Sequence, residues 1–531
     1  MSGKVLLIGI DGGTWVILQP IMEKGYMPNL KSLVDGGAWG ILKSTIPPLT
    51  APAWTTFMTG LDPGRHGIVE FNNYDGAYGT YFVTNASIKQ KTIWELASEM
   101  GLRVISVNVP LTYPPFPVRG FMVTGMLTPD TSRFTYPPSL GKVILEEFGE
   151  YRIVTTGKVY VLHGLDRFFQ ELRKTVKLRA DVVSYLLSTM EWDLAMVHFF
   201  STDVLQHFAF HCLDPTHPHH HPPCMEKAYR FYQELDKAIG QVLEAADRRG
   251  VSLKIALSDH GFMQVHTTIL LNSLLAKHGF FRPESRSLAG EVIWRLLRGM
   301  RRNFFVKFMR WFVDWEKREK SILFLRRQGK LGISESIAFS LNGGIYGNIY
   351  INLKGRQPNG IVEEKDYLRI REEIKEALKD ERGVKQILLR EEAFGTSNLA
   401  SLPDLVVVPE KGYAFSPYLS VDRNKPYVKN YVRADYTGTH HIEGIWIVEG
   451  KGVKRGRVDA HIIDLLPTIF WYLGLAIPDY AQGRVVKEAF REEFSGSREE
   501  KRVKMDPRRE PGKTYGEEGA LEERLHDLGY L

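Results

Sequence analysis

The sequence predicts an α/β fold in which a mostly parallel central sheet is flanked by helices on both faces. Short, continuous apolar runs recur along the chain, which is typical of strands buried on both faces of a sheet. Segments of helical composition lie between these runs, as parallel connections require. The chain has 531 residues, of which 44% are hydrophobic and 25% charged, so it can bury a large core. The predicted strands are KVLLIGID (4–11), RVISVNVP (103–110), WDLAMVHFF (192–200), LKIALSDHG (253–261) and GIWIVEG (444–450).

Helices are predicted where strong helix formers dominate, over residues 225–248 and 365–379. Clusters of Gly and Pro at 110–120 and 213–223 predict loops. A change in composition after residue 281 indicates an insertion into the α/β core. The predicted parts are a first part of the α/β core (1–281), an inserted basic amphipathic helical cap (282–345), a second part of the core (346–486) and a charged C-terminal tail with a short terminal helix (487–531).

Positive charge is concentrated in one segment of this insertion. The net charge of the chain is +7, and residues 282–330 hold 14 basic but only 5 acidic residues, so the remainder is close to neutral. This distribution argues against specific nucleic-acid binding by the body of the protein. The segment has two interpretations: a cap packed on the body, or a peripheral contact with an anionic membrane surface. Its aromatic side chains share one helical face: Phe304, Phe308, Trp311, Phe312 and Trp315.

The cysteine content and the N-terminus predict a cytoplasmic protein, with peripheral membrane contact if segment 282–330 provides it. Two cysteines, Cys212 and Cys224, are too few for a disulfide-stapled secreted scaffold. The apolar run 5–10 is too short for a signal peptide, and no apolar stretch approaches the length of a membrane span. The His- and Pro-rich stretch 211–224 has two interpretations, an extra metal site or a rigid surface loop near the active site. We expect the rigid loop, with Asp214 and His217 shaping substrate access.

Acidic residues and histidines follow several of the apolar runs, at the edge of a parallel sheet where ligands bind. Asp203 and His207 are four residues apart, so a helical turn places both on one face. Taken singly, such an Asp is often a cap and such a His is often structural. Together, carboxylates and imidazoles suit Zn²⁺, Mn²⁺ or Fe, and six of them can hold two ions about 3.5–4 Å apart. The candidate metal ligands are Asp11, Asp203, His207, Asp259, His260 and His440.

A nucleophile for such a site is offered by Thr50 in IPPLTAPAWTTFMTG (46–60). Pro52 and the residues after it indicate a helix that starts near Ala51. A hydroxyl at that N-terminus can be activated by a metal, and the helix dipole favours a bound phosphate. The alternative is that Thr50 only caps the helix.

An ordered set of motifs across most of the chain carries a family resemblance. The motifs are LLIGIDGGTW (6–15), MPNLKSLVDGGAWG (27–40), PPLTAPAWTTFMTGLDPGRHGI (47–68), STDVLQH (201–207), ALSDHGF (256–262), TGTHHIEGIWIVEGKGV (437–453) and DLLPTIFWYLGLAIPDYAQGRV (464–485). With these motifs the chain resembles the alkaline phosphatase superfamily, specifically its nucleotide pyrophosphatase and type I phosphodiesterase branch, which includes predicted phosphohydrolases and phosphomutases. The resemblance implies an alkaline-phosphatase-like fold.

The resemblance also implies roles for the candidate residues. Thr50 is expected to be the catalytic nucleophile, to contact a metal and to form a phospho-threonine intermediate. One divalent ion is expected on Asp11, Asp259 and His260 beside Thr50, and the second on the remaining three candidates, Asp203, His207 and His440. Zn²⁺ is the expected metal and Mn²⁺ the alternative. The expected substrate is a small phosphate ester such as a nucleotide, cleaved at a phosphodiester or pyrophosphate bond.

Departures from the family pattern define the alternatives. Where nucleotide pyrophosphatases tend to have T-F-P-N, this chain has T-A-P-A, so Ala53 replaces an asparagine that helps to bind phosphate. Thr50 and Trp54 do not fit the sulfatase signature. The alternatives are a phosphomutase or phosphomonoesterase of the same superfamily, or an inactive membrane-surface or partner-binding protein. Arg65 and His66 are predicted to be structural, and Arg356 is a candidate phosphate contact.

Overall fold

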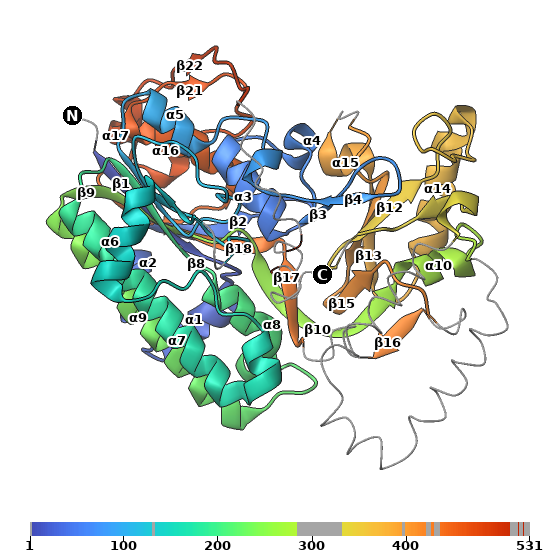
Figure 1. Cartoon of the computed structure of the whole chain (residues 1–531), viewed down its shortest axis with the longest axis horizontal. Helices are drawn as coiled ribbons and strands as arrows, with labels where there is room; N and C mark the ends of the chain where they lie inside the picture. The colour runs from blue at the N-terminus through green and yellow to red at the C-terminus, as the bar shows by residue number, and fades with distance from the viewer. Residues whose placement is uncertain are drawn as a thin grey trace.

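The computed structural model has a large lobe built around a central sheet and a smaller lobe beside it (Figure 1). It describes residues 3–129, 133–283, 332–342, 344–395, 399–420, 426–429 and 436–509, together with 519 and 524. Among the described helices, none combines the length and apolar character of a membrane span.

A mixed sheet forms the centre of the large lobe, in the order β19-β2-β18-β9-β1-β8-β5-β6-β7, with β20 beside β2. The inner strands β9, β1, β8, β5 and β6 are parallel, whereas β18 is antiparallel to both of its neighbours. Each of the five predicted strands is a strand of this sheet, so the predicted class is confirmed. The strand bounds are β1 Lys4–Ile10, β2 Ala38–Lys43, β5 Val104–Val107, β6 Gly120–Val123, β7 Thr135–Tyr136, β8 Leu194–Phe199, β9 Val251–Leu257, β18 Glu443–Gly450, β19 Gly456–Arg457 and β20 Ala460–His461.

Helices cover both faces of the sheet, which explains why its inner strands are continuously apolar. On one face α2, α7, α8 and α9 pack together, and on the other α3, α5 and α16 do so (Figure 1). The predicted helix 225–248 lies within α9. The helix bounds are α2 Pro28–Gly36, α3 Thr50–Thr59, α5 Ile93–Glu99, α7 Lys158–Thr189, α8 Ser201–Leu213, α9 Pro222–Arg248 and α16 Leu465–Leu473.

The smaller lobe has its own antiparallel sheet, in the order β11-β12-β14-β13, and its own hydrophobic core. Strand β10 (Gly261–Leu270) links the lobes: its start pairs with β17 (Gly438–His441), and its end pairs with β15 (Gly412–Ser416) and β16 (Tyr427–Lys429). The predicted helix 365–379 is present as α14. The other bounds are β11 Ala338–Phe339, β12 Gly347–Ile351, β13 Val384–Leu389, β14 Leu405–Pro409, α10 Leu271–Lys277 and α14 Tyr367–Leu378.

The predicted cap and membrane-contact segment, 282–330, lies outside the described residues apart from 282 and 283. The end of the predicted cap includes β11, which pairs with β12 of the small sheet. The cap and the membrane contact therefore stay predictions.

The C-terminal tail is ordered further than its composition indicated. Phe490 is buried and packs with Phe494 against Trp471 of α16. Arg509 is an almost buried cation that pairs with Glu95 of α5. Up to residue 509, aromatic contacts and the pairing of Arg509 with Glu95 thus hold the predicted charged tail against the large lobe. The predicted terminal helix lies almost wholly outside the described residues.

Candidate active site

The carboxyl ends of three adjacent parallel strands bring the predicted acidic ligands together. Asp11 directly follows β1, Asp203 lies in the first turn of α8 after β8, and Asp259 lies two residues after β9. All three side chains are fully buried. Because the strands are neighbours in the sheet, residues far apart in the sequence meet at one edge, as expected for an open parallel sheet.

Helix α3 places the predicted nucleophile beside this edge. The helix begins at Thr50, and Leu49 is the extended residue at the N-cap. Pro52 is tolerated because it lies in the first turn. Thr50 is fully buried, and its Oγ1 lies 3.3 Å from Nε2 of His260. Thr50 is therefore the first helical residue rather than the N-cap, and its hydroxyl faces a predicted metal ligand.

The three predicted histidine ligands share one orientation. Each Nδ1 lies 3.1–3.2 Å from a backbone carbonyl oxygen. A carbonyl only accepts, so in the neutral ring Nδ1 carries the proton and Nε2 presents its lone pair to the cluster. Metal-binding histidines are held in this way. The pairs are His207 with Gly438, His260 with Gly261 and His440 with Pro48.

One set of ligand atoms converges at the start of α8. Nε2 of His440 lies 3.0 Å from Oδ1 of Asp203 and 3.0 Å from Nε2 of His207. Asp203 Oδ1 and His207 Nε2 are 3.5 Å apart. Two imidazole lone pairs and a carboxylate at such separations repel one another, and a cation between them would remove that repulsion. The set matches the predicted ligands of one ion.

A second set surrounds Nε2 of His260. This nitrogen lies 3.2 Å from Oδ2 of Asp259, 3.7 Å from Oδ1 of Asp11 and 3.3 Å from Oγ1 of Thr50. Two ligands of one tetrahedral Zn²⁺ at 2.0–2.2 Å are about 3.3–3.6 Å apart. Ligand atoms of Asp11, His260 and also Asp203 lie within 4.8 Å of one another. Asp203 thus faces both sets, whereas the sequence assigned it to only one.

Burial and mutual repulsion act strongly on these carboxyl groups. Burial, followed by repulsion from Asp259 and Asp203, raises the pKa of Asp11 well above its ordinary value. Burial and then repulsion from Asp203 raise the pKa of Asp259 to about 7. Within the described chain, Oδ1 of Asp11 and Oδ2 of Asp259 are buried without a hydrogen-bond partner. Two divalent cations would supply the missing partners and remove the repulsion, so the donor set fits them.

The histidine rings are kept in the form that binds metals. Burial lowers the pKa of His440 to about 3. Burial and the neighbouring His440 lower the pKa of His260 well below its ordinary value. Both rings are therefore neutral near pH 7, and they stack with 3.6 Å between ring centres. Only neutral imidazole is a ligand.

Sequence reasoning missed the residues that support the ligands. His198 is fully buried in β8, and its Nε2 lies 2.9 Å from Oδ2 of Asp11 while its Nδ1 lies 3.1 Å from the carbonyl oxygen of Asn108. The hydroxyl of Thr202 donates to the carbonyl oxygen of Asp11. The backbone N–H of Gly12 donates to Oδ1 of Asp259. The only sequence signal for His198 was an imidazole inside an otherwise apolar strand.

Two other sequence predictions can be compared with the structure. His66 is buried, its Nε2 lies 3.0 Å from Oγ1 of Thr56, and its Nδ1 accepts from the backbone of Ile68, so it has the structural role that we predicted. Arg356, our candidate phosphate contact, instead pairs with the buried carboxylate of Asp404 in the small lobe. It was a wrong prediction because sequence alone does not reveal an internal partner.

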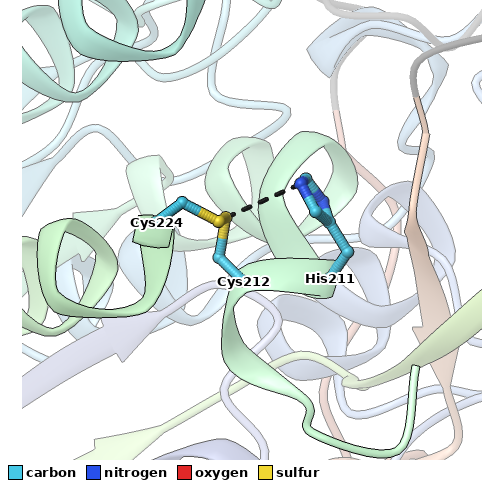
Figure 2. Close-up of side chains that lie close together, drawn as sticks. All are labelled: His211, Cys212 and Cys224. Atoms are coloured by element: carbon cyan, nitrogen blue, oxygen red, sulfur yellow. Dashed lines mark hydrogen bonds between the residues drawn. A yellow bond between two sulfur atoms is a disulfide. The ribbon is translucent and has the colours of Figure 1, made fainter. Parts of the chain in front are cut away.

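The His-rich loop holds a third group of metal-ligand atoms, His211, Cys212 and Cys224, and the two cysteines form a disulfide (Figure 2). The low cysteine count had argued against a disulfide scaffold, but it does not report spatial proximity. The end of α8 and the start of α9 place the two Cα atoms 5.3 Å apart, within the range for a disulfide. Asp214 and His217 were expected to shape substrate access. Asp214 bonds to Thr216 within the loop and also lines a cavity described below, whereas His217 bonds to the carbonyl oxygen of Thr437.

A cavity of about 360 Å³ lies among the described residues, and neither Thr50 nor any of the six candidate ligands lines it. Phe262 lines it, and the ring of Phe262 also lies 4.9 Å from the ring of His207. The cavity wall includes Trp15 and Trp39, whose rings pack edge to face. Its charged side chains are three cations and two anions: Lys385, Lys411, Arg457, Asp214 and Glu443. Aromatic faces and ammonium groups together suit an anionic aromatic group.

Comparison with known proteins agrees with this architecture. The family model described as type I phosphodiesterase / nucleotide pyrophosphatase matches residues 5–442. The human ectonucleotide pyrophosphatase / phosphodiesterase 5 structure aligns with a TM-score of 0.51 at 14% identity, covering 92% of this chain and 99% of that one. Phosphonoacetate hydrolase from Sinorhizobium meliloti 1021, in complex with phosphonoformate, gives a TM-score of 0.51 at 17% identity, covering 89% and 95%.

The murine ectonucleotide pyrophosphatase / phosphodiesterase 5, as an inactive variant in complex with AMP, also gives a TM-score of 0.51, at 13% identity, covering 92% of this chain and 100% of that one. Identities this low support the fold, and the fold is the alkaline-phosphatase-like one that the sequence predicted. No curated protein sequence matches the chain.

Proposed function

The chain belongs to the type I phosphodiesterase / nucleotide pyrophosphatase family, and from that premise we propose that it hydrolyses phosphodiester or pyrophosphate bonds with two divalent cations and Thr50 as nucleophile. The proposal assigns one cation to Asp11, Asp259 and His260 and the other to Asp203, His207 and His440, with Thr50 beside the first. Zn²⁺ is the proposed metal because the six ligands mix carboxylates with imidazoles.

One observation carries the proposal: the hydroxyl of Thr50 lies 3.3 Å from Nε2 of His260, inside a buried cluster whose imidazole lone pairs converge. If Thr50 had only a structural role, three buried carboxylates that repel one another would destabilise the fold around it without any benefit. If Thr50 is the nucleophile, the carboxylates are needed, because cations held by them stabilise the charge of a transferred phosphoryl group.

The side chains of the cluster have separate tasks in the proposed reaction. Oγ1 of Thr50 attacks phosphorus, the new O–P bond replaces the bond to the leaving group, and water later cleaves the phospho-threonine. His198 and Thr202 hold Asp11 in place, and the amide of Gly12 holds Asp259. When bound, the two cations would neutralise the carboxylates, favour the deprotonated hydroxyl and polarise the phosphoryl oxygens.

Phosphate binding must differ from that of relatives with an asparagine in the T-x-P-N motif. The corresponding Ala53 is fully buried in α3 and offers no side-chain donor. The N-terminus of α3 lies beside the nucleophile, and its dipole favours an anion there. We therefore propose that main-chain donors contribute more to phosphate binding in this chain.

Nucleotides are the proposed substrate class. The aromatic and cationic cavity has Phe262 in its wall, whose ring also contacts His207, and it supports an anionic aromatic group. The murine structural neighbour was solved with AMP, which supports the same class.

The test is hydrolysis of bis-p-nitrophenyl phosphate and p-nitrophenyl phosphate by the metal-loaded protein and by Thr50→Ala, with EDTA as the metal-removal arm. We expect diester cleavage that needs Zn²⁺ or Mn²⁺ and falls at least 10³-fold in Thr50→Ala, because the nucleophile is lost. Thr50→Ser should retain part of the activity, since it keeps a hydroxyl.

Thr55→Val is the matched control. Thr55 is another buried threonine of α3, and its hydroxyl donates to the carbonyl oxygen of Ala51. This variant should keep wild-type turnover even if it is less stable. Metal-dependent turnover that survives in Thr50→Ala would contradict the nucleophile assignment, and a preference for the monoester would favour a phosphomonoesterase.

A further inference from the structure

The last turn of α8 brings together three atoms that bind soft metals. The disulfide of Cys212 and Cys224 lies beside the imidazole of His211, whose Nε2 is 3.7 Å from Sγ of Cys212 (Figure 2). We propose that these three residues form a zinc site when the disulfide is reduced, separate from the catalytic cluster. The disulfide and the zinc complex would then be two alternative states of the same residues.

The distances fit zinc. With Zn–S of 2.3 Å and Zn–N of 2.0–2.1 Å, a thiolate and an imidazole on one tetrahedral ion are about 3.6 Å apart, close to the observed 3.7 Å. Two thiolates on that ion are about 3.8 Å apart, so breaking the S–S bond lets the sulfurs separate to their positions. Hence His211 needs little movement, and the two sulfur atoms move apart by less than about 2 Å.

The ring of His211 is oriented for this role. Its Nδ1 lies 3.2 Å from the hydroxyl of Thr437, which leaves Nε2 directed at sulfur. Burial, with neighbouring His217 and His221, lowers the pKa of His211 to about 4, so the ring is neutral near pH 7. Neutral imidazole is the form that binds metal.

A fourth ligand is available in the same loop. His221 is exposed, and its ring centre lies 6.5 Å from that of His211. Two imidazoles on one tetrahedral ion have ring centres about 5 Å apart, so the exposed side chain of His221 would have to turn toward His211 to complete the site. His217 is unsuitable because its two nitrogens already bond to the carbonyl of Thr437 and the amide of His219. A site of two cysteines and two histidines is a common structural zinc site.

The exchange of states balances chemically. A dithiol reductant donates two electrons and two protons, the S–S bond breaks to give two thiols, and the reductant becomes a disulfide. Zn²⁺ then binds and displaces the two thiol protons. In the cytoplasmic location predicted from the sequence, thiols are kept reduced, so the zinc state would prevail there.

Cobalt absorption on the full-length protein tests the proposal. The protein, with and without prior reduction by a dithiol, is titrated with Co²⁺ without oxygen. We expect reduced protein to bind one more Co²⁺ per chain than oxidised protein, with a near-ultraviolet thiolate-to-cobalt charge-transfer band that Zn²⁺ abolishes. The catalytic cluster has only oxygen and nitrogen ligands, so it cannot give this band, and the test is independent of phosphohydrolase activity.

Variants assign the ligands. His211→Ala should weaken Co²⁺ binding in the thiolate band at least tenfold, whereas His219→Ala, an exposed histidine of the same loop, should leave it unchanged. The wild type alone can also overturn the proposal. It would do so if the reduced protein had two titratable thiols but showed no thiolate-to-cobalt charge-transfer band. Equal affinities of His211→Ala and wild type would also overturn it.

Discussion

Helix α8 begins in one cluster of metal-ligand side chains and ends in another, and the two are built differently. Asp203 and His207 in its first two turns meet ligands from β1, β9 and β17, which are distant in sequence. His211 and Cys212 in its last turn meet Cys224 from the next helix. The first cluster depends on the whole fold, whereas the second needs only one loop.

The side chains at the two ends of α8 differ in how their mutual repulsion can be removed. Three buried carboxylates at the start of α8 repel one another and cannot bond to each other once ionised. The two cysteines at its end can form a covalent bond, which removes the need for a cation. This comparison shows that the charge of the first cluster can be neutralised only by protons or cations, whereas the second cluster has a covalent alternative.

The largest expected effect comes from removing the carboxylate shared by the two ion positions. Asp203→Asn removes a charge that faces both sets of ligands, so we expect metal-dependent diester hydrolysis to fall about 10³-fold or more. The measurement is kcat/KM together with metal content per chain. The thiolate band of the reduced protein at the other end of α8 should not change.

Asp236→Asn is the control for this change. Asp236 is also a buried carboxylate, but it accepts from the backbone amides of Asn29 and Leu30 at the start of α2. Its substitution should lower the melting temperature and leave metal content intact. If Asp203→Asn kept both metals and full turnover, the shared position of Asp203 would be wrong.

The second prediction concerns the pH dependence of metal binding at the catalytic cluster. The pKa of Asp259 is raised to about 7, so in the metal-free protein this carboxyl holds a proton below pH 7 that a cation must displace. The affinity should therefore rise as the pH increases, by at least about tenfold per unit below pH 7, because Asp11, whose pKa is also raised, can hold a second proton that a cation must displace. His440, whose pKa is lowered to about 3, does not compete in this range.

Competition with a chelating dye of known pH dependence measures this slope. An affinity that is constant between pH 5 and 7 would show that Asp259 is already ionised in the metal-free protein, and would contradict the electrostatic account of the cluster. Asp259→Asn should flatten the slope and weaken binding at pH 7.

The sequence predicted the parts of the site that local rules describe. Continuous apolar runs predicted the strands that carry Asp11 and Asp259, and the four-residue spacing predicted that Asp203 and His207 share a helical face. The start of α3 was predicted within one residue of Thr50. These features follow from periodicity and from proline and glycine placement, which act over a few residues.

Features that depend on partners distant in sequence were not predictable. His198 gave no spacing signal, because its partner Asp11 is supplied by another strand. Arg356 looked like a phosphate contact until Asp404 was found opposite it. The cysteine count gave no information on the proximity of Cys212 and Cys224, which the loop between α8 and α9 brings together. Sequence alone names the candidate groups, but the sheet and helix packing decide what each one faces.

The third prediction tests whether His198 of strand β8 supports the candidate metal ligand Asp11. His198→Met keeps much of the volume but removes the contact with Oδ2 of Asp11, so we expect metal affinity to fall about tenfold. Isothermal titration with Mn²⁺ measures it. His66→Met is the control, because His66 is equally buried but bonds to Thr56 and Ile68 away from the cluster. Equal affinity in the two variants would remove His198 from the list of supporting residues.

The smallest expected effect comes from the residue that joins the two ends of α8. The backbone N–H of Thr437 donates to the carbonyl oxygen of His207, while its hydroxyl accepts from the backbone N–H of His211. Thr437→Val removes only the hydroxyl, so the bond to His207 remains. We expect kcat for the diester to fall about threefold or less, whereas cobalt binding in the thiolate band should weaken because the ring of His211 loses its anchor.

Thr437→Ser keeps the hydroxyl and should restore both properties. In Thr437→Val, the loss of kcat compared with the loss of thiolate-bound cobalt shows how independent the two clusters are. If Thr437→Val lowered kcat about as strongly as Asp203→Asn does, the end of α8 would be needed to position His207, and the two clusters would form one coupled unit. A small loss of turnover together with a clear loss of thiolate-bound cobalt would instead keep them separate, because the main-chain bond alone would then suffice to hold His207 against its neighbouring strand.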